Sequence, residues 1–177
     1  MKNQKTKEAY ELRRGILEGL LSNILTAKEI KEISGLSYRQ INDWDKKGIL
    51  PAQEREESNA WRWRRFTGAN AIQLSVLAKL RKAGLPVIDL KELHKWMREG
   101  ERTMSEYIKD HISRGFGVFL STNLKDRFFF NSDGEKDVSE MILLAYNEHG
   151  GMGIVLQVSI NDIVNDILKT LNQKPLK

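Results

Sequence analysis

The chain has 177 residues, of which 40% are hydrophobic and 30% charged, enough for one ordinary domain or two small ones with a buried core. It has no Cys, which excludes disulfides, thiolate metal sites, iron–sulfur clusters and Cys nucleophiles. The net charge of +5 is uneven, because residues 1–99 hold 20 Lys and Arg against 13 Asp and Glu while residues 100–177 hold 9 against 11. The first part of the chain is therefore expected to contact a polyanion.

Nothing in the sequence directs the chain to a membrane. No apolar run approaches the roughly 20 residues that span a bilayer. The polar start, MKNQKTKEAYELRR, lacks the apolar stretch of a signal peptide. We expect a soluble cytoplasmic protein.

The first predicted elements are three helices. Residues 7–22 have apolar positions at helical spacing, including Leu12, which predicts an amphipathic helix. Thr26 to Glu29 is typical of a capping box before a short helix over 27–33. Ser37 to Gln40 is a second capping box, opening a helix that ends at Lys46-Lys47-Gly48. Two short helices joined by a turn at Gly35 predict a helix-turn-helix.

A charged segment and two more helices follow. Residues 51–66 lack a continuous apolar face, and their second arm, 61–66, alternates aromatic and basic residues, which predicts a β-hairpin wing. Thr67 is expected to cap a helix reaching Ala83, with Ile72, Val76, Leu77 and Leu80 buried. Pro86 then starts a helix whose apolar stripe is Val87, Leu90, Leu93 and Trp96.

These pieces, in this order, resemble the MerR family of bacterial transcription regulators over about residues 25–97. The resemblance is carried by LTAKEIKEISGLSYRQINDWDKKGILP, by WRWRRFT and by AIQLSVLAKLRKAGLPVIDLKEL. One departure lies in the recognition helix, where Ile41-Asn42-Asp43-Trp44 replaces the family's Leu-Arg-aromatic-aromatic. The family's base preference is therefore not transferred to this chain.

The resemblance implies a DNA-binding surface made of the recognition helix, the helix caps and the wing. Its expected members are Thr26, Ser37, Tyr38, Arg39, Gln40, Asn42, Asp43, Lys46, Lys47, Arg62, Arg64 and Arg65. Arg39 can pair with guanine or clamp a phosphate, Asn42 can pair with adenine, and Tyr38 can reach phosphate or sugar. The alternative for this helix face is plain solvation, and Lys46 and Lys47 are explained equally by phosphate contact or by helix capping.

The wing has two interpretations as well. Its arginines can contact the DNA backbone, or form salt bridges with Glu54, Glu56 or Glu57 on the opposite arm. Trp61 and Trp63 are expected to anchor the wing to the body, with DNA contact as the alternative. Trp44 is expected in the core, between the recognition helix and the helix before it.

The rest of the chain predicts a small α+β unit. A helix over 103–113, with Met104, Tyr107, Ile108 and Ile112 buried, precedes two strands at 115–121 and 127–131 that form a hairpin. A helix over 137–149, a strand over 153–159 and a last helix capped by Asn161 complete a ββαβα order.

The expected domains are an N-terminal helix over 1–24, the winged helix-turn-helix over 25–99, a linker or dimerisation helix over 100–114 and an α+β domain over 115–177. The last of these would serve dimerisation or effector binding. The N-terminal helix either packs on the winged body or exchanges onto a partner subunit.

No catalytic or cofactor site is expected. The scattered histidines His94, His111 and His149 lack metal-ligand spacing, and Gly150 to Gly153 lacks the Lys-Ser/Thr of a phosphate loop, so it is interpreted as a turn. No Ser-His-Asp or paired-carboxylate arrangement emerges, so an enzyme is the least favoured class.

We therefore expect a homodimeric, nucleoid-associated transcription regulator that binds an inverted-repeat operator in double-stranded DNA, with RNA polymerase as a further candidate partner. Two alternatives stay open. One is an architectural, excisionase-like or segregation-like DNA-binding protein with the same winged module. The other is a protein-interaction module that has lost DNA binding, for which Asp43 beside the groove is the argument.

Overall fold

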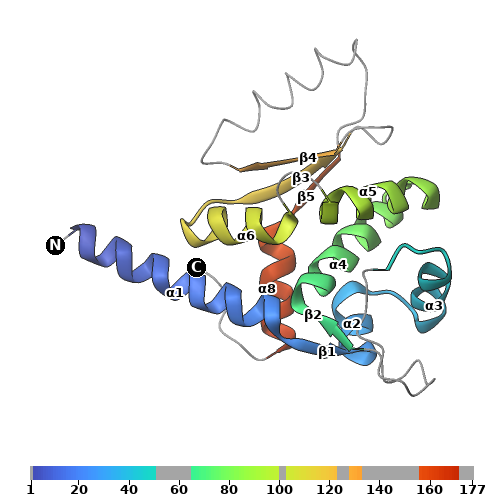
Figure 1. Cartoon of the computed structure of the whole chain (residues 1–177), viewed down its shortest axis with the longest axis horizontal. Coiled ribbons are helices and arrows are strands. Elements are labelled where there is room, and N and C mark those ends of the chain that lie inside the picture. The colour runs from blue at the N-terminus through green and yellow to red at the C-terminus, as the bar shows by residue number, and fades with distance from the viewer. Residues whose placement is uncertain (1, 51–64, 100–102, 123–127, 133–155, 172–177) are drawn as a thin grey trace, which may run out of the picture.

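The computed structural model describes residues 2–50, 65–99, 103–122, 128–132 and 156–171. Seven helices and two small antiparallel sheets make up this part of the chain (Figure 1). In chain order the elements are α1 (Lys2–Ser22), β1 (Ile24–Thr26), α2 (Ala27–Ser34), α3 (Tyr38–Lys46), β2 (Arg65–Thr67), α4 (Gly68–Lys82), α5 (Val87–Glu99), α6 (Met104–Ser113), β3 (Val118–Thr122), β4 (Phe128–Ser132), β5 (Leu156–Ser159) and α8 (Ile160–Thr170).

The predicted helix-turn-helix is present. Both capping boxes form, at Thr26 with Glu29 and at Ser37 with Gln40, and Gly35 ends α2 in the left-handed region at φ +71°. Lys47 is the C-cap residue of α3, and Gly48 follows it at φ +66°. The local cap signals thus place both helix starts and both helix ends.

The strand pair β1–β2 was not expected. Leu25 faces Phe66 in its antiparallel register, and both side chains are completely buried. This short ladder holds the N-terminus of α2 beside the N-terminus of α4. The wing hairpin itself, with Arg62 and Arg64, lies outside the described residues.

Helix α4 lies at the centre of the core. The four predicted core positions are buried, and the polar residues Gln73 and Ser75 are buried as well. Helix α8 packs against α4 and α2 (Figure 1), and Ser75 lies in a lining that it shares with Ile163 and Asp166 of α8. In α5 the fully buried stripe is Leu90, Leu93, His94 and Met97; Val87 and Trp96 are only partly buried.

Helix α1 packs within its own subunit against α4 and α6. Its contact with α4 is so close that a Cβ on Gly68 would overlap the Leu20 carbonyl oxygen. One apolar position of the predicted amphipathic helix does not join the core, because the Leu12 side chain is 66% exposed.

The second half of the chain contains the predicted pair of strands, but the N-cap residue of its last helix differs from the predicted one. Strands β3 and β4 pair antiparallel, β5 pairs along the other edge of β3, and the expected buried stripe of α6 is confirmed. Ser159, not Asn161, caps α8. The Asn161 side chain instead accepts from the Val118 amide at 2.7 Å and donates to the Phe116 carbonyl at 3.3 Å, which fixes the start of β3. The helix expected over 137–149 lies outside the described residues, so the full ββαβα order stays a prediction.

Candidate nucleic-acid interface

Helix α3 has one buried face and one exposed face. Ile41 and Trp44 are buried, which confirms the core role expected of Trp44. Arg39, Gln40, Asp43, Lys46 and Lys47 are exposed, and Tyr38 and Asn42 are half-buried. The core contacts of Ile41 and Trp44 therefore orient the polar face of α3 toward solvent.

Three of the expected DNA-binding side chains are engaged in capping. The Thr26 hydroxyl donates to Glu29 Oε2 at 2.7 Å and accepts from the Glu29 amide. Gln40 Oε1 accepts from both the amide of Ser37, at 2.9 Å, and its hydroxyl, at 2.8 Å. Thr26, Ser37 and Gln40 are consequently held in fixed positions at the helix starts, and the hydroxyl protons of Thr26 and Ser37 are already donated within the caps.

Asp43 forms an ion pair with Lys47. The Lys47 Nζ donates to Asp43 Oδ2 at 2.7 Å, one turn further along α3, and both side chains are about half exposed. The pair has no net charge. It removes the repulsion that an isolated Asp43 would exert on a phosphate, and it also engages the Lys47 ammonium.

The sequence interpretation missed Lys31. Its ammonium lies 5.2 Å from the centroid of the Tyr38 ring, across the turn from α2 to α3. Lys31 is exposed and Tyr38 packs against the core. This contact brings a cation of α2 to the start of the recognition helix, where the first helix of such a motif passes the DNA backbone.

A second missed cation lies at the other end of α3. The Lys91 Cε is 4.0 Å from the position that a Cβ on Gly48 would take. Gly48 directly follows Lys46 and Lys47, so α5 brings Lys91 beside them. Only the fold joins these positions, and no local pattern indicates it.

Of the expected wing residues, the structure describes Arg65 alone. It is exposed, and it faces the exposed Thr26 across the β1–β2 ladder. Directly opposed residues in a ladder project on the same side. Arg65 therefore lies on the side of the ladder where α2 begins.

His94 and His111 are both buried. His94 lies on α5, its Nε2 has no hydrogen-bond partner among the described residues, and burial together with the nearby Arg98 lowers its pKa to about 4. His111 stacks on Tyr107 at 4.0 Å between ring centroids. Among the described residues there is no group of three His, Cys, Asp or Glu placed to hold a metal ion. His149 lies outside them.

The comparisons agree with this geometry. A family model described as MerR HTH family regulatory protein matches residues 25–101, the segment from β1 through α5. No curated protein matches the chain. None of the described helices combines the length and the apolar character needed to cross a membrane. Residues 25–101, somewhat less than half of the chain, are therefore similar to the MerR helix-turn-helix family of regulatory proteins.

Proposed function

We propose that this protein is a sequence-specific transcription regulator that binds double-stranded DNA as a homodimer, at an inverted repeat. The observation that supports the proposal best is the division of α3. Its residues Ile41 and Trp44 are buried in the core, and its exposed face carries Arg39 and Lys46. A helix of this kind enters the major groove with its N-terminal part, and a two-fold protein requires a two-fold operator.

The proposed roles follow from position. Arg39, in the first turn of α3, reads a base edge, and the half-buried Asn42 one turn later supports it. Lys31 and Tyr38 at one end of α3, and Lys46 with Lys91 at the other, hold the DNA backbone. Arg65 and the wing extend these backbone contacts.

The Asp43–Lys47 pair bears on the alternative of a module that has lost DNA binding. That alternative rests on a negative charge at the groove, and the pair compensates this charge within one turn of the same helix. The architectural alternative makes the same contacts, and it differs in showing no preference among sequences.

Selection from a random duplex library, followed by gel-shift titration at several salt concentrations, tests the proposal. We expect an enriched inverted repeat and an affinity that falls steeply as salt rises, because phosphate neutralisation releases counterions. Salt-dependent binding without enrichment selects the architectural alternative. Failure of the folded protein to bind any duplex selects the interaction module.

A further inference from the structure

A cavity of about 680 Å³ lies where α8 packs on the helix-turn-helix. We call it the α2–α4–α8 cavity. Its wall combines residues 32–36 at the end of α2, Gln40 of α3, the last two turns of α4, and Ile163 and Asp166 of α8. This volume lies within the range of pockets that hold small organic molecules.

The charges around the cavity are unequal. The lining includes the cations Lys79, Arg81 and Lys82 of α4, and the carboxylates Glu32 of α2 and Asp166 of α8. Arg81 is engaged by the Leu85 carbonyl, which accepts from its Nη1 at 3.1 Å. Lys79 and Lys82 form no ion pair within the described part of the chain. Two ammonium groups are therefore available to an anion.

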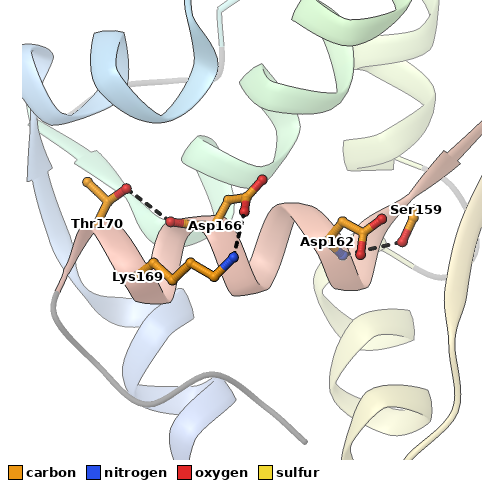
Figure 2. A network of polar contacts seen from close by, with 5 residues as sticks. All are labelled: Ser159, Asp162, Asp166, Lys169 and Thr170. Atoms are coloured by element: carbon orange, nitrogen blue, oxygen red, sulfur yellow. Dashed lines mark hydrogen bonds and ion pairs between the residues drawn. The ribbon is translucent and has the colours of Figure 1, made fainter.

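The carboxylate on α8 is partly compensated. Figure 2 shows Asp166 joined to Lys169 along α8, with Oδ1 and Nζ 3.4 Å apart. The Thr170 hydroxyl donates to the Asp166 backbone carbonyl at 3.0 Å. The lining has three cations, Lys79, Arg81 and Lys82, against the carboxylates Glu32 and Asp166, and Lys169 partly attenuates the charge of Asp166, so its net charge is positive.

The remaining wall is apolar or accepts hydrogen bonds. Ile33, Leu36, Ala78 and Ile163 supply hydrocarbon surface. The hydroxyls of Ser34 and Ser75 donate to backbone carbonyls of their own helices, at 2.7 and 2.8 Å. Their protons are thus used, and they offer an anion no donor. An anionic group is favoured only at the lysine side, with an apolar body against the rest of the wall.

We propose that the α2–α4–α8 cavity binds a small organic anion with an apolar body, and that its occupancy changes the DNA affinity of α3. The second half of this proposal rests on the proposed function. The cavity wall includes Gly35 in the left-handed turn that sets the angle between α2 and α3. It also includes Gln40, whose Oε1 caps α3. A ligand here contacts the recognition helix and α8 together, so binding at one site couples to the other.

The test of the cavity uses the full chain without DNA. The probe is 2-naphthoate, and its control is 2-naphthamide, which has the same apolar body but no charge. We expect saturable NMR shifts at the amides of residues 33–36 and 78–82, with naphthoate binding at least about fivefold more tightly. Shifts centred elsewhere, equal binding of the two probes, or no saturable binding overturns the cavity assignment.

Two variants locate the site. The double variant Lys79→Gln/Lys82→Gln should remove the preference for naphthoate, and Ala78→Met should block both probes by filling the apolar part. The control Lys95→Gln/Lys109→Gln changes the net charge equally on α5 and α6, and should leave the preference intact. A double variant of α4 that binds naphthoate as the wild type does overturns the role of these lysines.

DNA titrations with and without saturating 2-naphthoate test the coupling. We expect at least about a threefold change in DNA affinity, which Ala78→Met abolishes. An unchanged DNA affinity with the cavity occupied overturns the proposal that ligand binding regulates DNA binding. A folded protein that binds naphthoate but no DNA contradicts the proposed function and leaves the cavity assignment standing, so the two failures are distinguishable.

Discussion

The Lys47 ammonium and the Asp43 carboxylate lie 2.7 Å apart on the exposed side of the recognition helix. Each group limits what the other can do at a phosphate. Removing the carboxylate should release Lys47 for the DNA backbone. We expect Asp43→Asn to tighten DNA binding roughly threefold to tenfold and to steepen the salt slope by about one.

Gel-shift titration at several salt concentrations measures both quantities. The matched control is Asp110→Asn, which breaks a pair of the same spacing on α6, where Asp110 lies 2.7 Å from Arg114. This control should leave DNA binding unchanged. Weaker binding by Asp43→Asn would mean that Asp43 contacts DNA directly, for instance at a cytosine amino group.

Substitution of Arg39 tests whether α3 recognises the base sequence of the DNA. Arg39→Ala should cost about 1–3 kcal/mol of binding free energy on the selected operator and relax the preference at one position of each half-site. Fluorescence anisotropy against the operator and its single-base variants measures this. Arg14→Ala, at an exposed arginine of α1, is the control. An equal loss on every sequence would assign Arg39 to a phosphate.

Gly68 and Gly19 form a matched pair for the contact between α1 and α4. Gly68→Ala places a methyl group against the Leu20 carbonyl oxygen, so we expect a loss of about 2 kcal/mol or more in the free energy of unfolding. A Cβ at Gly19, inside α1, meets nothing within 4 Å, and Gly19→Ala should stabilise the protein by about 0.5–1 kcal/mol. Urea denaturation measures both, and a neutral Gly68→Ala would contradict this packing.

His94 makes the stability depend on pH. Its pKa is lowered to about 4 in the folded state, against 6.5 for an unperturbed histidine, so the unfolded chain binds the proton more readily. The contribution of neutral His94 to the free energy of unfolding is fully present above about pH 6.5 and is lost as the pH falls toward 4. Between about pH 7.5 and about pH 5 we expect this residue to contribute a loss of roughly 2 kcal/mol.

Urea titrations of the wild type and of His94→Met at the two pH values isolate this contribution. The variant should lose less stability on acidification, by the amount assigned to the histidine. An identical pH dependence in both proteins would show that His94 is charged, or solvated, in the folded state.

The sequence predicted what depends on neighbouring residues. The caps at Thr26 and Ser37 each involve four consecutive residues, so their pattern is visible along the chain. Asp43 and Lys47 lie one turn apart, but their ion pair was missed, because Asp43 was considered only for its effect at the groove and Lys47 only as a phosphate contact or a helix cap. Asn161 was misassigned because capping and a bond to a distant strand call for the same amide side chain.

Contacts between distant segments could not be predicted. Lys91 reaches the end of α3 only because α5 folds back beside it. Ser75 of α4 lies beside Ile163 and Asp166 of α8, a neighbour that no periodicity within α4 can indicate. The strand β1 has three residues, too few for an alternation to be recognised.

The position of α8 has a consequence for biosynthesis. The ribosome completes residues 25–101 long before it reaches residues 160–170, yet α4 and α2 are packed against that late helix. Until α8 emerges, one side of α4 that is buried in the mature fold faces water or a chaperone. The contacts of α2 and α4 with α8 can therefore form only after translation has passed the last described strand, β5.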